Sequence, residues 1–222
     1  MTHIPCWIIS LNPVSEMATT LSTALTAQGV AHEFFPAVDG RQGMPALQGR
    51  EHLDTPRTLR RHKRNLTSSE VGCYLAHYRA INKAFEQGLE HICILEDDVA
   101  LEPDFARVLA ELPGLPEDCE MVRLMGLRIR QRKLVSSIAG GTHNLVRPRR
   151  GWLGTQGYVL NRRGMQKFLD HAANIFEPID KVLDHFWEFD LRIYGIEPHL
   201  IYELEHPSSI KNRCRFPTLE SP

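Results

Sequence analysis

An apolar run that ends in three consecutive carboxylates constrains this chain more than any other stretch. Residues 92–95 are expected to form a short buried strand, and Glu96, Asp97 and Asp98 follow it directly. Three adjacent negative charges repel one another, which raises the free energy of the folded chain unless water or a cation screens them. The pattern therefore allows two interpretations, a solvated turn or a cation site at the end of a strand.

Strands and helices are expected to alternate along the chain. Short apolar runs predict strands at 6–10, 31–38, 91–95, 120–125 and 157–160. Capping residues and apolar spacings of three and four predict helices from a cap at Asn12 to Gly29 and over 67–88, 103–112, 161–173 and 178–187. The segments 41–66 and 126–153 are expected to be mainly loop, with a weak strand signal near 143–146. Such alternation predicts an α/β fold with a mostly parallel, doubly wound sheet.

Composition excludes several classes of function. The 222 residues suit one sizeable domain, and a net charge of −1 provides no general attraction for nucleic acid. No segment approaches the roughly 18 apolar residues of a membrane span, and the N-terminal residues do not resemble a secretion signal. Five scattered cysteines without a CxxC pair favour a reducing, cytoplasmic setting over a disulfide scaffold.

Basic side chains gather in the segments 57–65, 128–133 and 147–150. Charge runs of this kind are usually solvated loops. The alternative is contact with an anionic membrane surface or acceptor, to which each clustered Lys or Arg contributes about 1 kcal/mol. The residues alone leave both interpretations open.

The acids after residues 92–95 stand where an open α/β sheet binds ligands, beyond the carboxyl end of a strand. Strand alternation predicts that Glu96 and Asp98 share one side and that Asp97 points to the other. Hard oxygen ligands suit Mg²⁺ or Mn²⁺, and Mg²⁺ is usually held by one or two carboxylates together with substrate phosphates. Phosphatases and receiver domains share such triplets, but they need an Asp after the first strand, and "IISLNP" (8–13) has none.

Residues 66–99, "LTSSEVGCYLAHYRAINKAFEQGLEHICILEDDV", resemble the signature segment of glycosyltransferase family 25, the lipopolysaccharide and lipooligosaccharide sugar transferases. Weaker matches follow in the family's order at "IISLNP" (8–13), "HEFFPAVDG" (32–40), "GTQGYVLNRRGMQKFL" (154–169), "PIDKVLD" (178–184) and "HPSSI" (206–210). The chain departs from the family at "VSEMATT" (14–20), where members commonly carry an arginine pair.

The resemblance implies a GT-A-type, Rossmann-like nucleotide-diphospho-sugar transferase fold over residues 1–222. Residues 1–125 would form the nucleotide- and metal-binding half, and residues 126–222 the acceptor-binding half. It implies an inverting enzyme that uses Mn²⁺ or Mg²⁺ and moves a sugar, most often galactose, from a UDP-sugar to a lipooligosaccharide or lipopolysaccharide acceptor. Such a protein is expected in the cytoplasm, with the cytoplasmic face of the inner membrane as a peripheral site. A family member that binds nucleotide-sugar or a partner without turnover is the alternative, which the missing arginines allow.

The resemblance also implies roles for individual residues. The expected metal ligands are Glu96, Asp98 and His206. The expected donor-binding residues are Ser10, Asn12, Asp39, Glu70, His77, Glu96, Asp97, Gly154, Thr155 and Gln156. The expected catalytic base is Asp180 or Asp184, which are four residues apart and share one face of a helix.

Several candidate residues also have a purely structural interpretation. Glu70 has capping-box spacing from Thr67, and Asp39 begins an Asp-Gly turn. Asp180 and Asp184 also suit the first turns of a helix, where negative charge is stabilising. Trp152 is expected either to stack on a sugar ring or to pack in the core.

Overall fold

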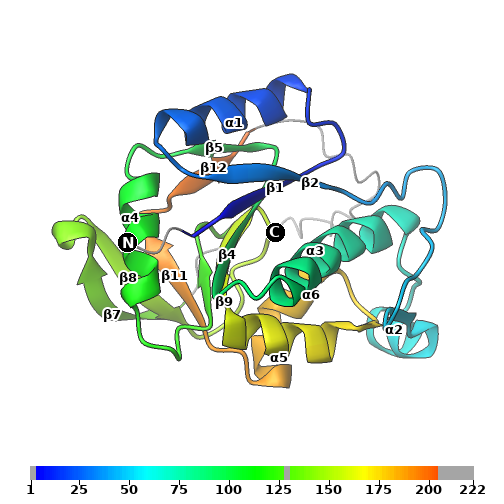
Figure 1. The fold of residues 1–222 in the computed structure, drawn as a ribbon. Helices are drawn as coiled ribbons and strands as arrows, with labels where there is room; N and C mark the ends of the chain where they lie inside the picture. The colour runs from blue at the N-terminus through cyan, green and yellow to red at the C-terminus, as the bar shows by residue number, and fades with distance from the viewer. Residues whose placement is uncertain (1–3, 128–130, 205–222) are drawn as a thin grey trace, which may run out of the picture.

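An eight-stranded sheet in the order β2-β1-β4-β9-β6-β11-β8-β7 forms the centre of the computed structural model, which describes residues 4–127 and 131–204 (Figure 1). The strands are β1 (Cys6–Ser10), β2 (His32–Pro36), β4 (His91–Glu96), β6 (Met121–Arg123), β7 (Arg132–Ile138), β8 (His143–Pro148), β9 (Gly157–Asn161) and β11 (Ile193–Glu197). Two small sheets pair β3 (His52–Leu53) with β10 (Asn174–Ile175) and β5 (Val99–Leu101) with β12 (Ile201–Glu203).

Most strands of the large sheet run in one direction. β2, β1 and β4 are mutually parallel, as are β6 and β11. β9 is antiparallel to both β4 and β6, and β8 is antiparallel to both β11 and β7. Only β8 and β9 of this sheet therefore run against the others, and the predicted α/β fold with a mostly parallel sheet is confirmed.

Helices cover both faces of the sheet. They are α1 (Glu16–Ala27), α2 (Thr55–His62), α3 (Ser68–Glu86), α4 (Phe105–Glu111), α5 (Arg162–Ala172) and α6 (Ile179–Asp184), with short 3-10 turns at η1 (Leu112–Gly114), η2 (Ala139–Gly141) and η3 (Phe186–Phe189). Alternate residues of β4 enter different cores, because successive strand side chains point to opposite faces. Ile92 and Ile94 pack with α3, α5 and α6, whereas Cys93 and Leu95 pack with α1 and α4.

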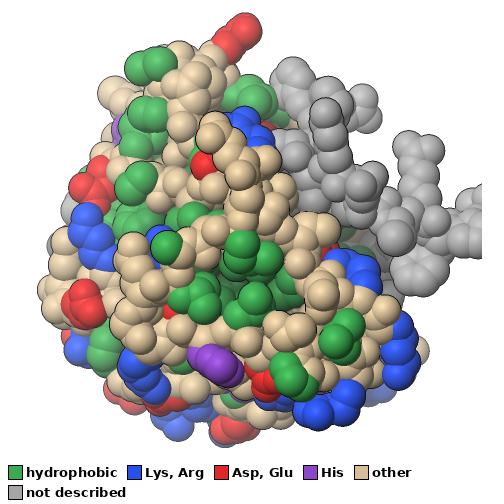
Figure 2. Space-filling model, turned by 90° about the vertical axis from the view of Figure 1, so that its right-hand side faces the viewer, with side chains coloured by type: hydrophobic (Ala, Val, Ile, Leu, Met, Phe, Trp, Pro, Cys, Tyr) green, Lys and Arg blue, Asp and Glu red, His purple; other side chains and the backbone are tan. Residues whose placement is uncertain are grey.

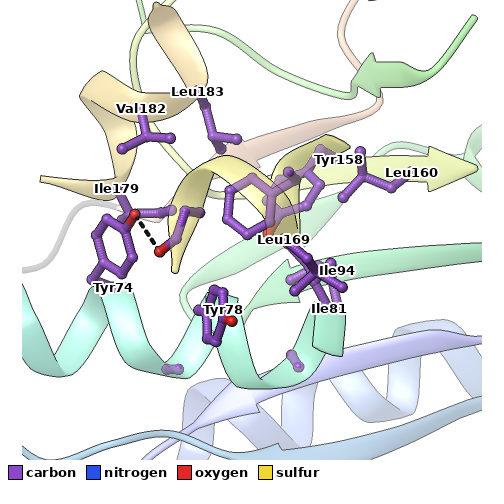
Figure 3. Packing of buried hydrophobic residues seen from close by; sticks show 14 of the residues in the cluster. Tyr74, Tyr78, Ile81, Ile94, Tyr158, Leu160, Leu169, Ile179, Val182 and Leu183 are labelled. Atoms are coloured by element: carbon purple, nitrogen blue, oxygen red, sulfur yellow. Dashed lines mark hydrogen bonds between the residues drawn. The ribbon is translucent and has the colours of Figure 1, made fainter. Parts of the chain in front are cut away.

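The helix α3 fits its sequence prediction closely. Thr67 accepts a hydrogen bond from the Glu70 backbone N–H, and the Glu70 side chain accepts one from the Thr67 backbone N–H, which completes the predicted capping box. Its buried stripe packs against α5 and α6 (Figure 3), where the Tyr74 hydroxyl donates to the Ala172 carbonyl oxygen at 2.9 Å. Long-range packing thus fixes the helix that precedes the acidic strand end.

The first helix begins later than predicted. Ser15 caps α1 by accepting from the Ala18 N–H, whereas the Asn12 side chain accepts from the Val14 N–H in a local turn. An Asn side chain two residues from a backbone N–H forms such a turn readily. The predicted cap at Asn12 is therefore wrong, although Gly29 does follow the helix end with a positive φ of 71°.

The prediction of a loop over 41–66 is also wrong, because this segment contains β3 and α2. Asp54 caps α2 by accepting from the Arg57 N–H, and a proline stands in the first turn of the helix. The arginines that suggested a solvated loop are partly used inside the protein: the Arg57 guanidinium lies 3.4 Å from the centroid of the Phe176 ring. Within the described residues, no helix is both long and apolar enough to cross a membrane.

Arg61 joins α2 to the segment before α6. Its Nε lies 2.9 Å from an oxygen of Glu177, whose side chain is completely buried. His185 Nδ1 lies 3.1 Å from each Glu177 oxygen. Burial raises the pKa of the Glu177 carboxyl, and the charges of His185 and Arg61 oppose that rise. Arg61 therefore compensates a buried charge as well as linking two helices.

We expect Arg61→Met to destabilise the protein by about 3 kcal/mol at pH 7.5, because it leaves Glu177 buried with fewer compensating charges. The pKa of Glu177 would then rise further, so the native state would bind more protons than the unfolded state and stability would recover as the pH falls toward 5. Urea unfolding at several pH values measures both effects.

The exposed Arg60 of the same helix provides the control, and Arg60→Met should change stability by less than about 0.5 kcal/mol. Equal stabilities of Arg61→Met and Arg60→Met would contradict this assignment of Arg61.

Candidate functional site

The carboxyl ends of β1 and β4 meet the residues that precede β9. Because β9 runs antiparallel to β4, its entry lies beside the end of β4, with Leu95 opposite Gly157. The Glu96 N–H donates to the Gln156 carbonyl oxygen at 2.9 Å. The topology therefore brings the predicted Gly154–Gln156 segment next to the acidic triplet.

Glu96, the last residue of β4, points toward α3. Strand alternation places it on the same face as Ile94, which packs against that helix. Its Oε1 accepts a short hydrogen bond from the Thr155 hydroxyl and lies 3.2 Å from His77 Nε2. His77 is 1% exposed, and its Nδ1 lies 2.9 Å from the Tyr158 hydroxyl. Three of the predicted donor-binding residues, Glu96, His77 and Thr155, thus lie in direct contact.

Asp97 is turned toward β1. The Ser10 hydroxyl donates to Asp97 Oδ2 at 2.5 Å and accepts from the Asn12 N–H at 3.0 Å. Burial raises the pKa of Asp97, and the charge of Glu96 raises it further against the lowering effect of the Ser10 hydrogen bond. Because β4 ends at Glu96, Asp97 and Asp98 lie in a turn, and the alternation expected of them does not extend that far.

The carboxyl of Asp98 has a strongly raised pKa. Burial raises the pKa of Asp98 to about 7, and the charges of Glu96, Glu203 and Asp97 add to this effect. Its Oδ1 is buried without a hydrogen-bond partner among the described residues. A hard divalent cation would satisfy a buried carboxylate oxygen that lacks a donor and feels the charge of other carboxylates.

Sequence reasoning missed Glu203. It lies at the end of β12, which pairs antiparallel with β5, so that Glu203 stands opposite Val99. The Leu204 N–H donates to the Asp98 carbonyl oxygen at 2.8 Å, and Gln156 Nε2 donates to Glu203 Oε2 at 3.3 Å. The acid is about 100 residues from the triplet in sequence, and only the β5–β12 pairing brings it there. Carboxylate oxygens such as those of Asp98 and Glu203 are the type of ligand that Mn²⁺ and Mg²⁺ prefer.

Arg123 and Asp184 fix the loop that leads into β9. Arg123, which is 2% exposed at the end of β6, donates through Nη2 to the carbonyl oxygens of Leu153 and Gly154. Asp184 Oδ1 accepts from the Leu153 N–H at 3.0 Å. A Cβ at Gly151 would lie 2.1 Å from the Asp184 carboxyl carbon, so the loop packs directly on this carboxyl. Asp184 therefore holds this loop in place, whether or not it also has the predicted catalytic role.

Asp180 is the more accessible of the two predicted bases. It lies half-buried in the first turn of α6, where its Oδ1 accepts from the Lys181 N–H at 2.9 Å. Burial lowers the pKa of Arg123, and nearby groups that include Asp184, Asp180 and Glu96 oppose that change. Asp180 and Glu96 are thus both within electrostatic reach of the same guanidinium.

Glu70 and Asp39 are occupied by local partners. Arg64 forms a two-point ion pair with Glu70, at 2.6 and 2.7 Å, beside the capping box. Arg41 does the same with Asp39, and this side-chain hydrogen bond is the main cause that lowers the pKa of Asp39 to about 2. A Cβ at Gly72 would lie 2.5 Å from the Val38 carbonyl oxygen, so the Asp39 turn packs closely on the start of α3.

Two further predictions have different outcomes. Trp152 is 1% exposed and packs against Gly126 and Gly195, so it belongs to the core and is not placed to stack on a sugar. His206, the predicted third metal ligand, lies outside the described residues. The roles in donor binding, metal binding and catalysis stay predictions.

Comparison with known proteins agrees with the resemblance in the sequence. Procollagen galactosyltransferase 1 of Danio rerio is 28% identical over 223 residues, which cover 88% of this chain and 35% of that protein. A probable inactive glycosyltransferase 25 family member 3 of Bos taurus is 28% identical over 222 residues, which cover 87% of this chain and 36% of that protein. The chain therefore spans about a third of the length of these curated relatives.

A solved structure of Drosophila beta-1,4-galactosyltransferase 7, a variant in complex with manganese, UDP-Gal and xylobiose, superposes with a TM-score of 0.45 at 12% identity. It covers 92% of this chain and 72% of that one. The model of the family described as glycosyltransferase family 25 (LPS biosynthesis protein) matches residues 3–183. Because that match spans most of the chain, the protein belongs to glycosyltransferase family 25.

Proposed function

We propose that this protein is an inverting, metal-dependent glycosyltransferase that moves a sugar, galactose first, from a UDP-sugar to a lipooligosaccharide or lipopolysaccharide glycan. The observation that carries the proposal is the buried Oδ1 of Asp98, which has no hydrogen-bond partner among the described residues and lies within electrostatic reach of Glu96, Asp97 and Glu203. Family membership supports the reaction class, and a relative named as a galactosyltransferase supports the choice of sugar.

The donor would lie along the carboxyl edge of β1 and β4. In sheets of this kind, ligands bind beyond these strand ends. We assign the uridine to the side of Ser10 and Asn12, and the diphosphate to the side of Asp98. A divalent cation held by Asp98, with Glu203 and Glu96, would neutralise the charge of the departing diphosphate. The fixed loop at Gly154–Gln156 would position the transferred sugar.

We assign the general base to Asp180. Its carboxylate would take the proton of the acceptor hydroxyl while that oxygen forms a bond to the anomeric carbon. The bond from the anomeric carbon to the diphosphate oxygen breaks on the opposite face, and its electron pair leaves with UDP. Asp184 would serve the reaction indirectly, because its carboxylate holds the Leu153 N–H and thereby the loop before β9.

The acceptor would approach the face of the molecule that Figure 2 shows, on the side toward which β1 runs in Figure 1. Hydrophobic side chains gather at the centre of this face, and Lys and Arg side chains lie along its margin. Leu11 and Val14, in the loop after β1, are exposed. With Arg60 and Lys63 exposed around α2, we propose that the protein works in the cytoplasm and meets the anionic inner-membrane surface peripherally.

A second candidate function is binding of a nucleotide-sugar without turnover. One relative is named as probably inactive, and the arginine pair expected in 14–20 is absent from this chain. The acidic triplet is intact, which favours the catalytic proposal.

The test of the proposed function is UDP release from a panel of UDP-sugars, with and without an oligosaccharide acceptor, in Mn²⁺ or EDTA. We expect one donor, UDP-galactose first, to give release that needs Mn²⁺ and increases with acceptor. Tight binding of a UDP-sugar with no turnover at any acceptor would favour the second function. No binding of any UDP-sugar would contradict both functions.

We expect Asp98→Asn to abolish the Mn²⁺ response while stabilising the metal-free protein. The pKa of Asp98 is raised from 3.8 to about 7 in the folded state, so the native protein binds more protons than the unfolded chain between these values. Its contribution to the free energy of unfolding therefore falls as the pH rises from about 4 to about 7. Removing the charge should raise stability at pH 7.5 by at least about 1 kcal/mol, about 2–4 °C in Tm.

Thermal unfolding of the wild type and Asp98→Asn, each with EDTA or Mn²⁺, measures both effects. Mn²⁺ should raise the Tm of the wild type and leave that of Asp98→Asn unchanged. Glu102→Gln, which removes a charge just beyond β5, is the matched control and should keep the wild-type response. An undiminished Mn²⁺ shift in Asp98→Asn would show that Asp98 is not a ligand.

A further inference from the structure

We propose that Cys73, His77 and Glu96 form a binding site for a thiophilic divalent cation, with Zn²⁺ as the first choice. Cys73 and His77 lie four residues apart on α3, so their side chains share one face of the helix. Glu96 extends from the end of β4 toward that face. One ligand atom from each residue lies within 4.8 Å of the other two.

The geometry of the three residues suits zinc. Zinc binds Cys sulfur at about 2.3 Å and His nitrogen and carboxylate oxygen at about 2.0–2.2 Å, so tetrahedral ligand atoms lie roughly 3–4 Å apart. His77 Nε2 and Glu96 Oε1 are already 3.2 Å apart. A sulfur, a nitrogen and an oxygen ligand make three protein ligands, which leaves the fourth position for water, as in open zinc sites.

The neighbours of these residues hold the ligand atoms in place. Nε2 of His77 can bind a metal only when the ring proton is on Nδ1, and the Tyr158 hydroxyl oxygen lies 2.9 Å from Nδ1, where it can accept that proton's hydrogen bond. The Thr155 hydroxyl donates to Glu96 and so restricts its carboxylate. Partners of this kind orient metal ligands, and their loss commonly lowers metal affinity by roughly 10- to 100-fold.

The site differs in chemistry from the oxygen cluster at Asp98 and Glu203. Thiolate and imidazole select zinc-like metals, whereas carboxylates alone suit Mg²⁺ and Mn²⁺. Binding would remove the thiol proton of Cys73 and release it to solvent. On the proposed function, an ion at this site would hold Glu96 on the α3 side and withdraw it from the donor cation. Zn²⁺ would then inhibit sugar transfer while Mn²⁺ supports it.

Cobalt provides the direct readout, because a Co²⁺–thiolate bond gives an intense near-ultraviolet charge-transfer band that oxygen ligands do not give. The metal-free Asp98→Asn protein is titrated with Co²⁺ and then Zn²⁺, so that the oxygen site does not contribute. We expect a band that one equivalent of Zn²⁺ removes. Adding Cys73→Ser should abolish the band and weaken Zn²⁺ binding by more than about 100-fold, and Tyr158→Phe should weaken it by about 10-fold.

Two other thiols serve as controls. Cys119 is 8% exposed and follows η1, and Cys214 lies outside the described residues. Cys119→Ser and Cys214→Ser should keep the band, and loss of the band in either, or its survival in Cys73→Ser, would overturn the proposal.

A measurement on the unsubstituted protein covers the case in which Cys73→Ser does not fold. Saturating Zn²⁺ should slow alkylation of Cys73 at least about 10-fold, as mapped by mass spectrometry, because the bound thiolate is not available to react. An unchanged rate at Cys73 would contradict the site. Absence of UDP-sugar turnover in the assay above would count against the proposed function only, since the cobalt band does not depend on it.

Discussion

The antiparallel entry of β9 between β4 and β6 is the constraint on which the rest of the site depends. If β9 ran parallel to β4 and β6, residues 151–156 would lie at the opposite edge of the sheet. The observed direction instead brings this loop to the carboxyl ends of β4 and β6, against Glu96 and Arg123. Because β9 is hydrogen-bonded on both sides, the loop enters from a rigid element, which is what precise positioning of a ligand requires.

The buried charged groups at this edge of the sheet destabilise the folded protein. Burial raises the pKa of Asp97, Asp98 and Asp184 and lowers that of Arg123. Each change records a charged group removed from water without full compensation. Such groups persist where a bound ligand compensates them, and clusters of perturbed groups in one place are typical of functional sites. Burial also raises the pKa of Glu177, but there His185 and Arg61 offset part of the rise from inside the protein.

Local signals predict the elements that lead to this site. The apolar run before Glu96, the capping box at Thr67 and the cap at Asn161 all depend on residues within a few positions of one another, and the structure confirms them. The sequence does not predict α2, because its arginines resemble a solvated run and their partners, among them Glu177, are distant in the sequence.

Glu203 and Arg123 carry no local signal at all. Glu203 is a single acid in the run 201–204, and Arg123 is a single arginine at the end of a three-residue strand. Only the pairing of their strands with β5 and β9 brings these side chains to the site. The direction of the Asp97 side chain is also not predictable from the sequence pattern. Side-chain alternation applies only within a strand, and β4 ends at Glu96, one residue before Asp97.

Some polar residues at this edge are hydrogen-bonded within the protein, and others keep an atom without a partner among the described residues. Asp184 binds the Leu153 N–H, and Asp97 is bound to Ser10, so these acids shape the edge. Asp98 Oδ1, Gln156 Oε1 and Arg123 Nε are three of the ten buried side-chain atoms that lack a hydrogen-bond partner among the described residues. A buried polar group rarely stays unsatisfied unless a ligand, ion or water completes it. These three belong to the strand ends around the entry to β9, and Asp98 differs from the other two because its pKa is also raised by burial and by neighbouring carboxylates.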